Sequence, residues 1–133
     1  MLRLEIVTPE RRALDMDVDS VTVPTASGEA GILPNHAPLV SVLKPGILTY
    51  VQNNVINRLA VSSGFIEVSA NQIAVMVDTA DSAADIDIDE ALASRDTAER
   101  SIAMLIAAPV EEAEAAREQF EAAQAKITLC QNR

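Results

Sequence analysis

The sequence has 133 residues and a formal net charge of −10, with 20 acidic and 10 basic side chains. This charge repels nucleic acid and anionic lipid, so we expect no nucleic-acid partner and no direct lipid insertion. Two phenylalanines and one tyrosine are too few to build a base-stacking platform. The length suits one ordinary domain, or a small domain with an appendage.

Residues 1–80 show the alternation and turn spacing of many short strands. The residues Lys44-Pro45-Gly46 and the segment 52–54 have turn composition, and Pro24 is expected to end the second strand. The expected strands lie at residues 2–6, 18–23, 39–43, 47–51, 55–61, 65–68 and 73–77. Strands at this spacing are typical of an antiparallel β-sandwich or barrel.

The stretch 28–39 combines residues that restrict or extend backbone freedom, and it holds the only histidine, His36. Gly28 and Gly31 permit backbone angles that are closed to other residues, whereas Pro34 and Pro38 fix theirs. We therefore expect a rigid, shaped loop, the kind of segment in which contact residues are often found.

Composition changes at Asp78, where a segment with five aspartates among small residues begins (78–89). Asp87 is positioned to cap a helix, with Glu90 three residues later, and alanines and charged residues follow. Pro109 is expected to separate two helices, at about 88–107 and 110–130. The predicted fold class is α+β in sequence blocks: an antiparallel β-sandwich (1–84) followed by an antiparallel two-helix hairpin (85–133).

Each predicted helix carries a stripe at heptad spacing, much of it alanine. The stripes are Ile88, Leu92, Arg95, Ala98 or Glu99, Ile102, Leu105 and Ile106, then Ala113, Ala116, Phe120, Ala123, Ile127 and Cys130. Alanine buries little apolar area, so the hairpin should be marginal unless it docks on the sandwich or on a partner.

Catalytic and metal-binding patterns are absent from the sequence. A nucleophile–base arrangement would have to use His36, and the only cysteine, Cys130, lies on the second helix. One histidine and one cysteine do not make a metal cluster, and no lysine follows Gly28-x-x-Gly31 as a phosphate loop requires. We expect no catalytic residue, no metal and no cofactor. The lone cysteine fits a reducing compartment, and the start of the sequence has neither a signal-peptide nor a transit pattern.

Four motifs resemble the epsilon subunit of F-type ATP synthases, in order along the chain. They are Val7-Thr8-Pro9-Glu10, the whole stretch 28–39, Leu43-Lys44-Pro45-Gly46 and Gly64-Phe65-Ile66-Glu67-Val68, followed by Ala98-Glu99-Arg100 in the first helix. The resemblance implies a ten-stranded β-sandwich and two antiparallel helices. It also implies a non-catalytic central-stalk subunit that binds the gamma subunit and the c-ring and helps couple proton-driven rotation to ATP synthesis.

The resemblance also assigns contact residues. Gly28, Glu29 and Gly31 match the loop that faces the c-ring, and His36 and Pro38 match positions near the gamma and ring contacts. For the glycines and prolines, loop shape alone is an equally good explanation. The family's location implies the cytoplasmic face of a bacterial inner membrane or the stromal face of a thylakoid.

In the family the hairpin is a brake that extends into the alpha/beta catalytic head. Here residues 85–133 hold eleven acidic and five basic side chains, so we expect weak inhibition at an acidic head surface. Some members bind ATP through an arginine in this hairpin; Glu90 occupies that position in the matching segment 86–91, so we expect no tight ATP binding. A nucleotide-sensing module and a free-standing hydrolase are the alternatives; the first lacks the arginine and the second lacks a nucleophile–base pair.

Overall fold

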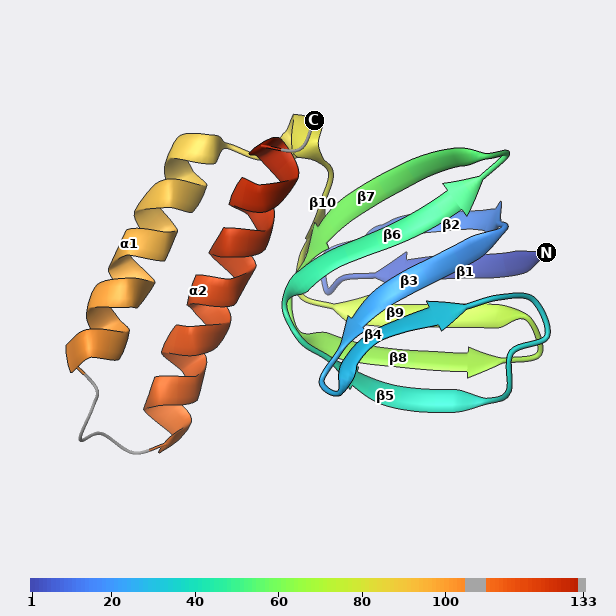
Figure 1. Ribbon diagram of the computed structural model, residues 1–133, viewed down its shortest axis with the longest axis horizontal. Coiled ribbons are helices and arrows are strands. Elements are labelled where there is room, and N and C mark those ends of the chain that lie inside the picture. The colour runs from blue at the N-terminus through green and yellow to red at the C-terminus, as the bar shows by residue number, and fades with distance from the viewer. Residues whose placement is uncertain (105–109, 132–133) are drawn as a thin grey trace.

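The computed structural model describes residues 1–104 and 110–131 and shows a β-sandwich with a helical hairpin packed at one end (Figure 1). This confirms the predicted fold class. The ten strands are β1 (Leu2–Val7), β2 (Arg12–Val18), β3 (Ser20–Thr25), β4 (Gly28–Ile32), β5 (Leu39–Leu43), β6 (Gly46–Gln52), β7 (Val55–Val61), β8 (Gly64–Ser69), β9 (Gln72–Val77) and β10 (Ala80–Asp81).

Strand β3 joins the two halves of the sandwich. Its first residues pair with β6, Thr25 pairs with Leu43 of β5, and β4 pairs along its other side. The strand order is therefore β10-β7-β6-β3-β5-β8-β9-β1-β2. Pro24 was predicted to end the second strand, but it lies within β3. Its carbonyl accepts a hydrogen bond from the Lys44 amide at 3.0 Å, at the point where β3 changes partner. The Pro24 nitrogen, which has no hydrogen to donate, therefore points toward the place where β3 changes partner from β6 to β5 and not toward β4.

One strand pair departs from the antiparallel pattern. β1 pairs with β2 in the antiparallel sense but with β9 in the parallel sense, from Arg3 beside Gln72 to Val7 beside Met76. Parallel partners need a long connection, which the intervening strands supply here. The spacing of turns predicts pairing only between strands that follow one another in the sequence, so it did not indicate this pair.

The core is formed by every second residue along the strands, the one whose side chain points into the sandwich. In β1, Leu2, Leu4 and Ile6 are fully buried, whereas Arg3 is exposed and Glu5 half-buried. Leu43, Leu48, Ile66 and Ile73 are also fully buried in the same cluster. The period-two alternation in the sequence therefore identified the core face correctly.

The stretch 28–39 is only partly a loop, so the prediction for it was wrong in its first half. Gly28–Ile32 is β4, because this segment pairs residue by residue with β3, from Thr25 beside Gly28 to Val21 beside Ile32. Gly28 has φ 122°, an angle that strains other residues. Residues 33–38 form the loop itself.

The helices are α1 (Ile88–Met104) and α2 (Val110–Gln131). The Asp87 carboxylate accepts hydrogen bonds from the amides of Asp89 (3.0 Å) and Glu90 (3.2 Å), which confirms the predicted cap and the start at residue 88. The predicted end at 107 and the break at Pro109 lie outside the described residues. Within the described part of the chain, no helix is long and apolar enough to cross a membrane.

The buried face of α2 is wider than the predicted stripe. Ala116, Ala123 and Ile127 are buried as expected, but so are Ala125 and Leu129, which the heptad pattern omitted. These two pack on Ala60 of β7. A heptad stripe describes one seam between two helices, whereas α2 contacts α1 on one side and the sandwich on another.

Replacing Gly64 with alanine should lower the free energy of unfolding by about 2–3 kcal/mol, because a Cβ there would collide with the carbonyl oxygen of Met76 and approach Val77 Cγ1 to 2.9 Å. Gly31→Ala is the matched control, with no atom within 4 Å of the added Cβ. Its effect should stay within about 0.5 kcal/mol. Urea denaturation of both variants measures the difference, and equal stabilities would contradict the packing around Gly64.

Candidate protein-docking site

An apolar row crosses four strands on the outer face of the sandwich. Cross-strand pairing sets Val42 of β5 beside Phe65 of β8, Phe65 beside Met76 of β9, and Met76 beside Val7 of β1. We call these four residues the outer apolar row. Each of the four has at least one strand neighbour buried in the core, such as Leu43 or Ile66, so alternation places the row on the outer face.

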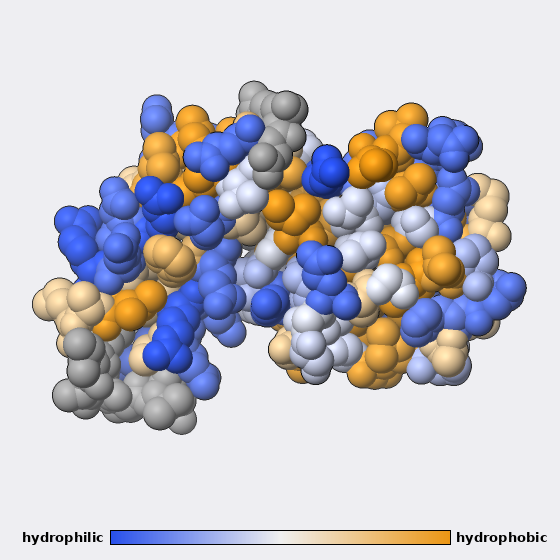
Figure 2. All heavy atoms as spheres, in the orientation of Figure 1, coloured by the Kyte–Doolittle hydropathy of each residue, from blue (hydrophilic) through white to orange (hydrophobic). Residues whose placement is uncertain are grey.

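Three residues of the row are exposed to solvent, and Val7 is half-buried. Val42 is 50%, Phe65 56% and Met76 41% exposed, and Val40, two residues before Val42 on the same face, is 77% exposed. Scattered apolar residues are normal on protein surfaces, but a contiguous set across four strands is typical of a contact surface. Figure 2 shows hydrophobic patches over the strands, while hydrophilic side chains dominate the hairpin in this view.

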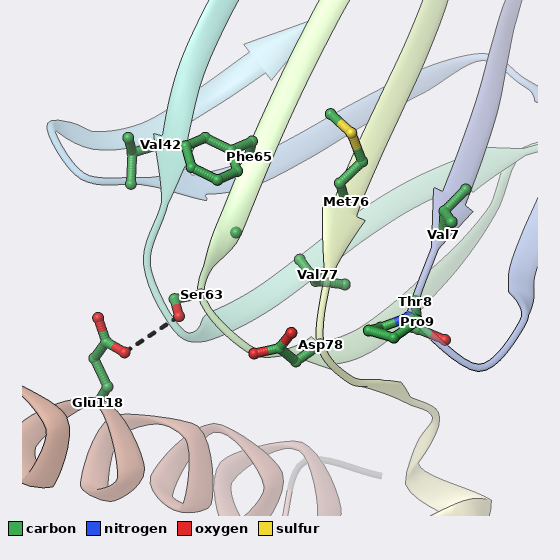
Figure 3. Close-up of a pocket in the computed structure, with 11 residues that line it drawn as sticks. Val7, Thr8, Pro9, Val42, Ser63, Phe65, Met76, Val77, Asp78 and Glu118 are labelled. Carbon is green, nitrogen blue, oxygen red and sulfur yellow. Dashed lines mark hydrogen bonds between the residues drawn. The ribbon is translucent and has the colours of Figure 1, made fainter.

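A surface groove of about 530 Å³ lies along this row and reaches the hairpin. Val7, Val42, Phe65 and Met76 line it from the strands, and Glu118 of α2 closes one end (Figure 3). Ser63 donates a hydrogen bond to the Glu118 carboxylate at 3.3 Å. The other polar residues of the groove, Thr8 and Asp78, come directly after the ends of β1 and β9 (Figure 3).

Charged residues flank the row on β1 and β2. Arg3 Nε donates to Asp15 Oδ1 at 2.7 Å, and Arg12 Nη1 lies 3.4 Å from Asp15 Oδ2. The hydrogen bond from Arg3, together with the charges of both arginines, lowers the pKa of the exposed Asp15 carboxyl. The surface thus has an apolar centre and an ionic margin, the composition of a protein-binding patch.

Among the described residues that line this groove, the polar side chains are Thr8, Ser63, Asp78 and Glu118, and none of them carries an imidazole or an amine. Among residues 1–104 and 110–131, no three His, Cys, Asp or Glu side chains gather to hold a metal ion.

The three residues predicted to meet the c-ring all lie on β4. Glu29 is exposed, as expected, but it is in a strand and not at the tip of a loop. It lines a groove of about 390 Å³ between the sandwich and α2, together with Lys44 and Phe120. Gly28 and Gly31 pair with Thr25 and Thr22 of β3, so both are part of the β3–β4 strand pair.

His36 and Pro38 lie in the loop after β4. The His36 amide donates to the Leu33 carbonyl at 3.2 Å, and the ring Nδ1 lies 2.6 Å from the Ala37 carbonyl oxygen. The Asn35 amide donates to Asn71 Oδ1 at 2.6 Å, which ties the loop to the turn between β8 and β9. The loop is therefore shaped by its own hydrogen bonds.

The structure separates these two groups of predicted contact residues. Glu29 is at the end of β4 that faces α2, and His36 follows the other end (Figure 1). Five strand residues span about 13 Å. An interface that buries about 800 Å² on each partner is about 28 Å across, so one partner surface is large enough to reach both groups.

Sequence reasoning missed the outer apolar row as a site. The signal was present in Phe65-Ile66-Glu67-Val68: if Ile66 and Val68 face the core, Phe65 shares the outer face with Glu67. What the sequence does not show is that Val42 and Met76 stand on either side of Phe65, because this needs the strand order and register.

Glu90 lines an acidic cavity of about 320 Å³ between the start of α1 and α2. Asp81, Asp85 and Asp87 line it too, and Lys126 is the basic residue among its described lining residues. A triphosphate placed here would face four carboxylates.

Known proteins similar to this chain agree on one family. Residues 1–83 match the family model described as ATP synthase, Delta/Epsilon chain, beta-sandwich domain. The ATP synthase epsilon chain of Desulfitobacterium hafniense (strain Y51) is 40% identical over 99 residues, covering 74% of this chain and 75% of the relative. The epsilon chain of Desulforamulus reducens is 46% identical over 100 residues, covering 75% and 76%.

A solved structure of the Euglena gracilis mitochondrial ATP synthase (OSCP/F1/c-ring, rotational state 1) contains a chain of the same fold, with TM-score 0.76 at 20% identity, covering 93% of this chain and 78% of that one. The family model and the epsilon-chain relatives carry the assignment, and the solved structure supports the fold. The chain therefore belongs to the epsilon chain family of ATP synthases.

Proposed function

We propose that this chain is a non-catalytic central-stalk subunit of a proton-translocating ATP synthase, which links the gamma subunit to the c-ring. The outer apolar row carries the proposal, because an exposed apolar surface on a rigid sandwich suits docking of a protein. Membership in the epsilon chain family supplies the complex in which the docking takes place. We assign the outer apolar row to the gamma contact.

The loop and strand residues complete the proposed contact surface. Glu29, with Gly28 and Gly31, is proposed to face the c-ring, and His36 and Pro38 to lie near both the gamma and ring contacts. Glu29 is exposed, so basic groups on a ring loop are able to reach it. The glycines contribute through the shape of β4 and not through side chains.

We propose that residues 1–84 and 85–133 act as two units. The hairpin packs against β6 and β7 through a small apolar cluster, so little burial opposes its extension toward the alpha/beta head. Its net charge of −6 counts against tight binding to an acidic head surface, and the four carboxylates of the acidic cavity count against nucleotide sensing. The proposed location is peripheral, at the cytoplasmic face of a bacterial inner membrane or the stromal face of a thylakoid.

Phe65→Ser should weaken binding of the purified gamma subunit about tenfold or more, because an aromatic anchor would be lost from the centre of the row. The side chain is 56% exposed, so folding should be preserved. Val55→Ser is the matched control: Val55 is 59% exposed but lies on β7, outside the row. Calorimetric titration with gamma gives both affinities, and equal losses for the two variants would remove the row from the interface.

Replacing Glu29 with Gln and His36 with Ala together should lower proton-driven ATP synthesis in membrane vesicles about two- to tenfold, through weaker rotor assembly. Glu10→Gln, an exposed carboxylate in the turn after β1, serves as control and should leave synthesis unchanged. Unaltered assembly and synthesis in the double variant would contradict the contact assignment.

The full chain should inhibit ATP hydrolysis by an epsilon-depleted ATPase less than about twofold, corresponding to under about 0.5 kcal/mol. A chain truncated after residue 86 should give nearly the same rate, since the acidic hairpin binds the head weakly. Strong inhibition by the full chain, lost on truncation, would show that the hairpin is an effective brake.

A further inference from the structure

The hairpin and the sandwich carry charge of the same sign. Residues 1–84 hold nine acidic and five basic side chains, a net charge of −4, and residues 85–133 have a net charge of −6. Like charges on two packed bodies favour separation. Some feature of the contact between them must offset this repulsion.

Apolar burial between the two parts is limited. The cluster that joins them contains Ala60 of β7 with Ala125 and Leu129 of α2, flanked by half-buried residues. The flanking residues are Ile47, Ala83 and Ile86. Leu129 is the one large side chain among its three buried residues, and the two alanines add little buried area, so this cluster is a much smaller attachment than the core of the sandwich. The hydrogen bond from Ser63 to Glu118 joins the same surfaces at 3.3 Å, but a hydroxyl donor does not neutralise charge.

Lys126 lies at the acidic cavity, where carboxylates of the sandwich and of the hairpin come together. Its Nζ lies 3.7 Å from Asp81 Oδ2, and the two side chains are 34% and 28% exposed. Asp81 belongs to β10 and Lys126 to α2, so the ion pair bridges the sandwich and the hairpin. Asp85, Asp87 and Glu90 line the same acidic cavity, and Lys126 is its basic residue among the described lining residues.

We propose that Lys126 is the clasp that holds the hairpin on the sandwich, by pairing with Asp81 and offsetting the other carboxylates of the acidic cavity. Without this cation, Asp81 of the sandwich would share the cavity with three exposed carboxylates of the hairpin, those of Asp85, Asp87 and Glu90, and no positive charge among the described lining residues would offset them. Lys126 and Asp81 are both half-buried, so solvent screens their attraction less than that of an ion pair on the open surface. We therefore expect this pair to stabilise the packed hairpin more than an exposed pair would. The resting position of the hairpin then depends on ionic strength.

Hydrogen–deuterium exchange of the full-length chain tests the clasp. Lys126→Gln should accelerate exchange of residues 123–131 about three- to tenfold at low salt, because the released, alanine-rich helix is marginal by itself. Gln and Lys have similar helix propensities, so helix formation itself is little changed. The acceleration should shrink as salt screens the carboxylates. Exchange in β9, at the core of the sandwich, should stay unchanged.

Arg117→Gln is the matched control, since it removes the same charge from the same helix. Arg117 is exposed and has no ion pair among the described residues. It should accelerate exchange less than about twofold. The double variant Asp81→Asn with Lys126→Gln should be no looser than Lys126→Gln, because it also removes a repelling carboxylate.

Three results would overturn the clasp: equal exchange in the Lys126 and Arg117 variants, a double variant looser than Lys126→Gln, or acceleration of β9 as large as that of α2. Since the isolated chain is measured, any of them would leave the proposed coupling role standing. Loss of gamma binding in the Phe65 variant, conversely, says nothing about the clasp.

Discussion

The whole sandwich depends on the change of partner along β3. Its first half pairs with β6 and its last residue with β5, so one short strand holds the two sheets in a fixed relation. Pro24 and Gly46 sit at this junction, and a Cβ on Gly46 would lie 2.9 Å from Pro24 Cβ. The close approach of these two residues brings β5 and β6 onto the same strand. The contact between Pro24 and Gly46 therefore also fixes the position of β5 and of Val42 on its outer face.

Two kinds of attachment differ in strength within the molecule. Fully buried leucine, isoleucine and valine side chains join the strands, whereas a small cluster around Ala60, Ala125 and Leu129, with a hydrogen bond and the Lys126–Asp81 ion pair, joins the described part of the hairpin to them. Between the helices, Gln119 donates to the Ser94 carbonyl at 3.4 Å and Arg95 to Gln124 at 3.4 Å, both long contacts. Arg95 Nε is buried and finds no hydrogen-bond acceptor among the described residues, although Asp96 Oδ1 lies 4.0 Å away. The rigid part of the chain is thus the part proposed to bind partners, and the loosely held part is the one proposed to move.

Sequence reasoning recovered the features that depend on neighbours along the chain. Alternation in β1 identified the core face, Asp87 was identified as a helix cap, and the order of strands followed by two helices was predicted from composition. It failed where distant segments meet. Residues Gly28–Ile32 form a strand because they pair with β3, which the local turn composition did not indicate. Leu129 is buried because it packs on β7, which the heptad spacing did not indicate. The outer apolar row needs register across four strands, which no local pattern contains.

The parallel pair of β1 and β9 has a consequence for biosynthesis. β1 is made before the other strands of the sandwich, yet it lies between β2 and a strand that ends at Val77. Until that last partner has emerged, the β1–β2 ribbon has one unpaired edge and an uncovered row of leucine and isoleucine. A nascent chain shorter than this cannot close its sandwich, and the growing polypeptide is most exposed to aggregation and to chaperones during that interval.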